Sequence, residues 1–210
     1  MKLIIAILTA KIVFTKLLMP YVDVLMNDPY TNKRFDLSDA VQKTGIKGAI
    51  LCFFNYDNAQ NRMVIGAKAP QPLDSINSWI AEARNSGLVD LAISFGGVDQ
   101  TLNVAEPAYF ILDISKLVSV YQTVIDQFKP TMIDFNIEQE SFANQDVLNR
   151  RIKALIEIRK NNPELKISLT LPATTGRDNN GGFLDFGIKV VKAATNQNFI
   201  FDCIFFLIRH

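Results

Sequence analysis

Three polar side chains recur at every second position near the middle of the chain, in the segment from Thr131 to Glu138. This period of two places Asp134, Asn136 and Glu138 on one face of an extended strand, with apolar residues on the other face. Burying polar groups is costly, and buried acids in clefts commonly serve as proton donors or acceptors. The pattern therefore favours a site for acid–base chemistry over a strand end that simply emerges into solvent.

Other kinds of active site are excluded by the composition. The single histidine is His210, and the two cysteines, Cys52 and Cys203, lie far apart in apolar runs. A serine such as Ser94 therefore has no histidine to activate it as a nucleophile, and the chain has no His/Cys set that could enclose a metal. We expect neither a metal nor another cofactor.

Short apolar, β-branched runs alternate with helical patterns along the chain. The runs cover residues 18–26, 49–56, 88–95, 132–138, 165–171 and 199–208. Apolar residues with a helical period predict helices at about 37–43, 74–86, 115–128, 146–160 and 183–194, with Ser115 as the N-cap of the third. Strands and helices in this order predict an α/β fold with a parallel sheet and crossover helices.

Two architectures fit this order, an open doubly wound sheet and a (β/α)8 barrel. The glycine fingerprint of a dinucleotide fold is absent after the first run, where the sequence reads Asn27-Asp28-Pro29-Tyr30. A barrel needs eight strands and typically ~250 residues, and six strands are found here. In either architecture the site forms at the carboxyl ends of the strands, where the polar residues cluster.

Two motifs resemble those of glycoside hydrolase family 18, the chitinases. Asp134-Phe135-Asn136-Ile137-Glu138 resembles the end of the family signature Asp-x-x-Asp-x-Asp-x-Glu, and Ser94-Phe95-Gly96-Gly97 matches its Ser-x-Gly-Gly on the preceding strand. The segments Pro20–Val24 and Leu171-Pro172 are similar to a bacterial branch of these enzymes. The resemblance spans about residues 18–202. It implies a partial catalytic domain over 18–210 and an incomplete TIM-type barrel with about six of eight strand–helix units.

The resemblance also implies roles for individual residues. Glu138 would protonate the glycosidic oxygen and then act as the base that activates water. No second carboxylate would serve as nucleophile, because in this family the N-acetyl group of the substrate attacks the sugar carbon and forms an oxazolinium ion. Asn136 stands at the position of the acid that orients this group, and Asp134 at the signature acid two residues earlier. Gly96 and Gly97, which follow Ser94, would let the backbone pass close to the substrate.

The sequence departs from the family pattern in three places. Thr131 and Asn136 replace the first and third acids of the signature. The sixth run, 199–208, lacks the tyrosine that the family uses to help the acetamido group react, and the seventh and eighth strands are missing. Loss of one charge that stabilises a transition state typically costs ~3–4 kcal/mol, or 10²–10³ in rate. Hydrolysis is therefore expected to be impaired.

Side chains at the mouths of the first two strands are further candidates. Tyr21, Asp23, Phe54 and Tyr56 either line a sugar groove or pack in the ordinary way. The polar loop 177–182 is suitably placed for substrate contact, although its composition is simply that of a turn.

Three functions from different classes remain open. The chain is a chitinase-like glycosidase with weakened activity, a protein that binds chito-oligosaccharides without turnover, or a fragment with no independent activity. The expected partner is chitin or a chito-oligosaccharide. Self-association is a further possibility, because open sheet edges and the apolar run 199–208 expose strands built for burial.

Charge and hydropathy limit the kinds of binding partner and the cellular location expected for the protein. The net charge of +1 gives no field that attracts nucleic acid, and no stretch approaches the ~20 apolar residues that span a bilayer. Residues 1–17 form a lead segment whose start, residues 1–10, has one basic residue and a short apolar run like a signal peptide, although it fits that pattern poorly. The alternative is an N-terminal strand or a disordered lead. The family resemblance implies a secreted protein.

Overall fold

A computed structural model describes residues 18–140, 144–174 and 182–208. The lead segment 1–17 and nearly all of the loop 177–182 lie outside these ranges. The parallel strands are β1 (Tyr21–Asp23), β2 (Gly48–Asp57), β5 (Asp90–Gly96), β7 (Met132–Asn136), β8 (Lys166–Thr174) and β10 (Cys203–Ile208). The helices are α1 (Leu37–Thr44), α2 (Asn77–Asn85), α3 (Ile114–Phe128), α4 (Gln145–Asn161) and α5 (Asp185–Thr195).

Several short strands and 3₁₀ turns lie at the carboxyl ends of the parallel strands or just before the helices. They are β3 (Arg62–Ile65), β4 (Gln71–Pro72), β6 (Val104–Ala105) and β9 (Gly182–Phe183), with the 3₁₀ turns η1 (Leu73–Ile76) and η2 (Pro107–Tyr109). β3 and β6 pair antiparallel with the end of β2, and β9 pairs with the end of β8.

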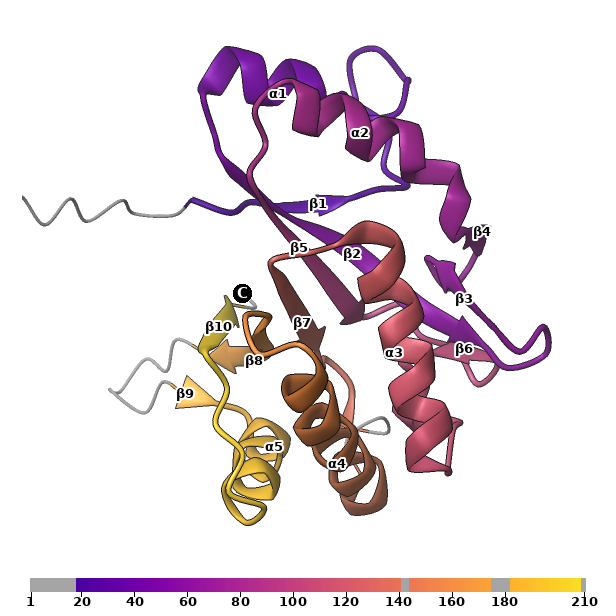
Figure 1. The fold of residues 1–210 in the computed structure, drawn as a ribbon, viewed down its shortest axis with the longest axis vertical. Coiled ribbons are helices and arrows are strands. Elements are labelled where there is room, and N and C mark those ends of the chain that lie inside the picture. The colour runs from indigo at the N-terminus through magenta and orange to yellow at the C-terminus, as the bar shows by residue number, and fades with distance from the viewer. Residues whose placement is uncertain (1–17, 141–143, 175–181, 209–210) are drawn as a thin grey trace, which may run out of the picture.

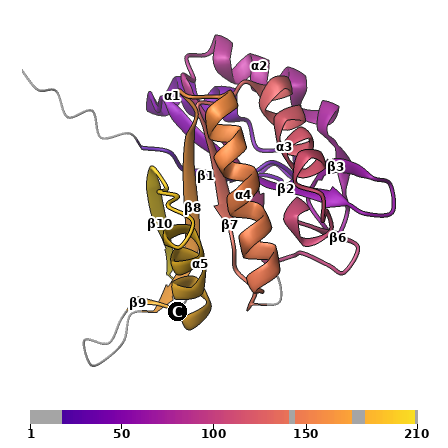
Figure 2. The same cartoon turned by 60° about the horizontal axis from the view of Figure 1, so that its bottom comes forward.

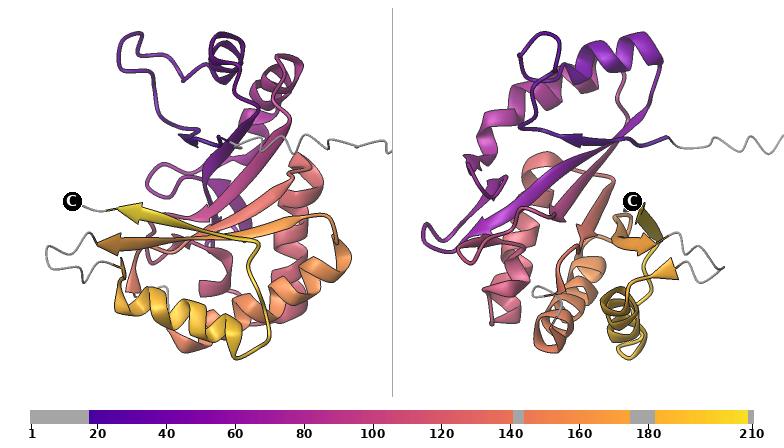
Figure 3. Two further views of the ribbon diagram at one scale, coloured as in Figure 1. Left: turned by 90° about the vertical axis from the view of Figure 1, so that its left-hand side faces the viewer. Right: turned by 180° about the vertical axis from the view of Figure 1, so that it is seen from behind.

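The six parallel strands lie beside one another in chain order, β1-β2-β5-β7-β8-β10. The helices follow one another around the outer side of this curved sheet (Figures 1 and 2). A doubly wound sheet would carry helices on both faces, and two views from other sides do not show that arrangement (Figure 3). The sheet is not closed: among the described residues β1 pairs only with β2, and β10 only with β8.

One large apolar core lies between the sheet and the helices. Alternate residues of β7, Ile133 and Phe135, are fully buried in it, and Phe135 stacks against Phe95 of β5 at 5.3 Å between ring centroids. Trp79 of α2 also packs here and donates its indole N–H to the carbonyl oxygen of Phe35 at 2.9 Å. The inner face of the sheet is different. A small apolar layer of Ile50, Ala92 and Met132 closes its amino end, and polar side chains occupy the layers above.

Element ends differ from the sequence prediction because side-chain caps and turns are decided locally. The N-cap of α3 is Asp113 rather than Ser115, since the Asp113 carboxylate accepts a hydrogen bond from the Lys116 backbone N–H at 2.7 Å. The predicted helix over 74–86 is divided into η1 and α2. The last strand begins at Cys203 rather than at Phe199, which is buried under the guanidinium of Arg159. None of the described helices is long and apolar enough to cross a membrane.

The β10 edge gives a first prediction. Phe206 is 61% exposed on a strand that has no charged residue and pairs on one side only within the described ranges. Such edges associate with other chains, so the 210-residue chain should form concentration-dependent oligomers. Phe206→Lys should shift it towards monomer in size-exclusion chromatography with light scattering. A wild-type chain that stays monomeric at all concentrations would contradict this expectation.

Candidate functional site

The strand register builds the centre of the site. It aligns Ser94 of β5, Asp134 of β7 and Ser168 of β8 in one layer across three adjacent strands. The next layer towards the carboxyl end aligns Gly96 and Asn136 with Thr170. Four polar side chains in these two layers are almost completely buried, namely those of Ser94, Asp134, Ser168 and Thr170.

Asp134 is the hub of a hydrogen-bond network. Its carboxylate accepts bonds from the hydroxyls of Ser94, Ser168 and Tyr21, each at 2.7 Å, and from Thr170 at 3.0 Å. Burial raises the pKa of Asp134, and the hydroxyl donors partly offset this rise. Burial and the neighbouring Asp134 carboxylate also raise the pKa of the Tyr21 phenol, so its proton stays in place to donate.

Asp134 should therefore make stability depend on pH. A carboxyl whose pKa is higher in the folded chain stabilises the fold below its unfolded pKa of about 3.8, and this contribution is lost as pH rises through the folded value. The free energy of unfolding of the wild type should fall, relative to Asp134→Asn, as pH rises above about 4. Urea denaturation at several pH values measures this difference. Asp146→Asn, at an exposed helix start, is the control; equal pH slopes for the wild type and Asp134→Asn would refute the expectation.

Asn136 and Glu138 stand above the hub, at the carboxyl end of β7. Asn136 is 3% exposed and Glu138 8% exposed. The side-chain amide of Asn136 donates to Glu138 Oε1 at 3.0 Å, while Asn136 Oδ1 is buried and has no hydrogen-bond partner among the described residues. An unsatisfied buried acceptor of this kind calls for a donor that the described part of the chain does not supply.

Two glycines allow the β5 end to approach this pair. Gly96 and Gly97 both have positive φ angles, +100° and +102°. A Cβ atom on Gly96 would lie 2.4 Å from the backbone oxygen of Asn136, and one on Gly97 would lie 2.5 Å from the ring of Phe53. The Gly97 N–H donates to the Asn136 carbonyl oxygen at 3.0 Å, which fixes the two strand ends together. Only glycine fits this approach without strain.

Most of the residues that the sequence suggested come together here. Asp134, Asn136, Glu138, Ser94, Gly96, Gly97 and Tyr21 form one contiguous group, and Asp23 lines a pocket next to it. Thr131, at the first position of the motif, is exposed at the amino end of β7, where its hydroxyl donates to the Leu91 carbonyl oxygen at 3.3 Å.

Phe54 and Tyr56 do not reach the site. A β-bulge between Leu51 and Phe54 shifts the register of β2 by one residue, which turns both side chains to the helix side of the sheet. Phe54 packs edge-on against Phe128 of α3, and the Tyr56 hydroxyl donates to Asn61. Phe53 and Asn55 take the inward positions instead, and sequence reasoning missed them because a strict period of two cannot show a bulge. Ser168 and Thr170 were also missed, although they carry the same alternating signal as β7.

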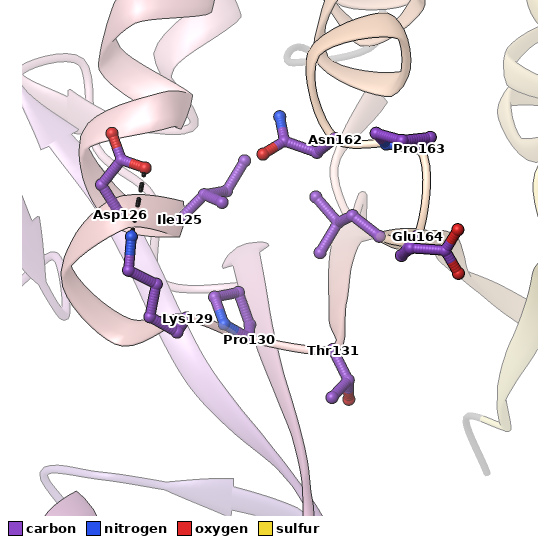
Figure 4. Close-up of a pocket in the computed structure, with 9 residues that line it drawn as sticks. Ile125, Asp126, Lys129, Pro130, Thr131, Asn162, Pro163 and Glu164 are labelled. Atoms are coloured by element: carbon purple, nitrogen blue, oxygen red, sulfur yellow. Dashed lines mark ion pairs between the residues drawn. The ribbon is translucent and has the colours of Figure 1, made fainter.

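A separate cavity lies at the opposite end of the strands. It has a volume of about 380 Å³ and is lined by residues at the ends of α3 and α4 and just before β7 and β8, including Lys129, Thr131 and Glu164 (Figure 4). Sites in this type of α/β fold form at the carboxyl ends of the strands. This cavity lies at the amino ends, so it is not part of the site that contains Glu138. Within the described ranges no three Asp, Glu, His or Cys side chains gather as metal ligands would.

Comparison with known proteins identifies the fold. No protein-family model matches the sequence, and no curated protein matches it. Among solved structures, the chain is similar to active domain 2 of a chitinase from Pyrococcus furiosus, with a TM-score of 0.73 and 23% identity over 90% of this chain and 56% of that one. A form of the same domain complexed with chito-oligosaccharides gives a TM-score of 0.71 at 22% identity, covering 89% of this chain and 55% of the other.

A third solved structure with a similar fold is also a chitinase. A GH18 chitinase from Pseudoalteromonas aurantia matches with a TM-score of 0.55 and 18% identity over 90% of this chain and 66% of that one. These likenesses show that the chain has an α/β fold of the kind found in chitinase catalytic domains. The chain spans little more than half the length of the Pyrococcus domain.

Proposed function

We propose that this chain is a chitinase-like glycoside hydrolase of family 18 type, which acts on β-1,4-linked N-acetylglucosamine polymers with a reduced rate. In this proposal residues 18–210 are a partial catalytic domain. Its six parallel strands correspond to six of the eight strands of a (β/α)8 barrel, since they follow chain order and carry helices on the outer side only. The similarity to chitinase domains supports the proposal at the level of the fold.

The observation that carries the proposal is the Asn136–Glu138 pair. Asn136 Nδ2 holds Glu138 Oε1 at 3.0 Å, and Asn136 Oδ1 remains as a buried acceptor without a partner in the described part of the chain. The N–H of an N-acetyl group is a donor of the right kind for this oxygen. One asparagine would then orient both the acid and the acetamido group of the substrate.

The proposed chemistry follows from these positions. Glu138 gives its proton to the glycosidic oxygen while the acetamido oxygen attacks the anomeric carbon, which breaks the glycosidic bond and forms the oxazolinium ion. The Glu138 carboxylate then takes a proton from water as the water oxygen adds to the anomeric carbon, and the bond between that carbon and the acetamido oxygen breaks, which restores the N-acetyl group. Asp134, fixed by its hydroxyl donors, holds the base of β7 in place beneath the pair.

Binding without turnover is the second candidate, and Asn136 is the observation that favours it. An amide keeps the size and hydrogen-bonding reach of a carboxylate but carries no charge to stabilise the cationic intermediate. The chain would then hold the sugar at the same site and release it unchanged.

One experiment tests the proposed function and separates the two candidates. Isothermal titration of chitotetraose into the 210-residue chain measures binding, and hydrolysis of a fluorogenic chitobioside measures turnover. We expect binding with slow hydrolysis. Binding with no hydrolysis above background would select the binding protein, and absence of binding would refute both. From the family resemblance we also propose secretion, which fractionation of the native host would test.

A further inference from the structure

A buried ion pair lies between the helices and has no role in the chemistry above. Glu106, at the start of η2, and Arg151 of α4 are each 2% exposed. Arg151 donates to Glu106 Oε2 from Nε at 3.2 Å and from Nη2 at 2.7 Å. An ion pair buried in this way often adds little net stability over well-packed apolar residues, so stability alone does not account for it.

The Glu106 side chain is held by three neighbours. Besides Arg151, the phenol of Tyr121 in α3 donates to its Oε1 atom, and the Ala108 backbone N–H donates to Oε2 at 3.2 Å. Burial and the adjacent Glu106 carboxylate raise the pKa of Tyr121 well above its ordinary value, so the phenol keeps the proton that it donates. Contacts from α3, α4 and η2 therefore fix this residue in one position.

A line of hydrogen bonds runs from Glu106 to the end of β7. The Glu106 backbone N–H donates to Oε1 of Gln100 at 2.8 Å, and Nε2 of Gln100 donates to the Gly97 carbonyl oxygen at 2.9 Å. The Gly97 N–H in turn donates to the carbonyl oxygen of Asn136 at 3.0 Å. Gln100 is 9% exposed, and both polar atoms of its side chain are used in these bonds. Its side chain therefore connects a firmly held residue to the strand that carries the site.

The turn that follows β5, residues 97–100, needs a connection of this kind. It begins at a glycine with a φ of +102°, and glycine by itself restricts the backbone little. The turn also contacts the residue after Glu138, because the side-chain amide of Gln139 donates to the carbonyl oxygen of Val98. The turn thus bonds to the chain at Asn136 and again just beyond Glu138. Its position therefore bears directly on where these two side chains lie.

We propose that Gln100 is a positioning residue for the hydrolysis. Through its two hydrogen bonds it holds the turn 97–100 against the end of β7, and thereby keeps Asn136 and Glu138 in the geometry that the reaction needs. The kinetic part of this inference rests on the proposed function. A displacement of about 1 Å can cost ~10² in rate even when the altered residue lies away from the reacting atoms. Gln100 itself neither gives nor takes a proton.

Two substitutions of Gln100 in the full chain test this role. Gln100→Met keeps the length of the side chain and removes both hydrogen bonds, whereas Gln100→Glu keeps the acceptor for Glu106 and removes the donor to Gly97. Each should lower kcat for the fluorogenic chitobioside by roughly 10- to 100-fold and leave the affinity for chitotetraose within about 2-fold of the wild type. Either variant decides the question if the other does not fold. Gln42→Met, at an exposed position of α1, should keep the full kcat.

Amide hydrogen exchange gives a measurement that does not depend on turnover. The Gly97 amide should exchange faster in both Gln100 variants than in the wild type, while the amides of α3 keep their rates. A contribution of Gln100 to global stability alone would speed all of these amides together and leave kcat of the folded chain unchanged.

The outcomes separate this inference from the proposed function. Unchanged kcat in the folded Gln100 variants would overturn the inference while the site at Asn136 stands. A wild-type chain that does not hydrolyse the chitobioside would overturn the proposed hydrolysis and, with it, the kinetic part of the inference. Equal Gly97 exchange rates in the wild type and both variants would then overturn the structural part as well.

Discussion

Replacing Asn136 with aspartate should raise the rate of chitobioside hydrolysis by up to ~10²–10³. The side chain is buried next to Glu138, where a charge is screened little by water. A carboxylate there would stabilise the oxazolinium cation, which the neutral amide cannot do.

The control separates this effect from a general change in charge. Asn85→Asp makes the same substitution at an exposed position at the end of α2. It should leave kcat/KM unchanged. If Asn136→Asp gains nothing while chitotetraose still binds with the wild-type affinity, then the amide is not what limits the rate, and the open sheet becomes the explanation.

The gain in rate of Asn136→Asp is expected to come with a loss of folding stability. Asn136→Asp places a second carboxylate within hydrogen-bonding reach of Glu138 and one layer above Asp134. Like charges in a buried site repel, so the variant should be less stable than the wild type at neutral pH. Thermal unfolding should be measured beside the kinetics, because a partly unfolded sample would hide part of the gain.

The strand that carries the site was predictable because its pattern is strict. Asp134, Asn136 and Glu138 alternate with large apolar residues, and the structure turns the two sets to opposite faces of β7. A period of two in sequence becomes two faces in space whenever the backbone is regular. The six parallel strands were predictable for a different reason, since strands covered on both faces read as continuous apolar runs.

In β2 the assumption of a regular period of two fails. A single bulge in β2 moves Phe54 and Tyr56 to the helix side and brings Phe53 and Asn55 inward. A bulge is a local backbone change set by tertiary packing, so the alternation of residues in the sequence does not reveal it. The same holds for pairing between distant strands. That Tyr21 reaches Asp134 depends on how the sheet curves, which composition does not encode.

Glu138→Gln should abolish hydrolysis, with a loss of ~10²–10⁴ in kcat, because a glutamine can neither give a proton to the leaving oxygen nor take one from water. The substitution is nearly isosteric, and its Oε1 can still accept the bond from Asn136. Chitotetraose affinity should therefore stay close to that of the wild type. The affinity is measured in the chain that keeps Asn136, and the loss of rate in the Asn136→Asp background, where the starting rate is expected to be higher.

A matched control lies two residues further along. Glu140 is largely exposed and pairs with Lys189 at 3.0 Å, so Glu140→Gln removes a carboxylate of the same kind from the same segment without touching the site. It should keep the full rate. A pattern in which Glu138→Gln lowers kcat and leaves binding intact, while Glu140→Gln changes neither, is what a proton donor produces; equal rates in the two variants would show that the proton comes from another group.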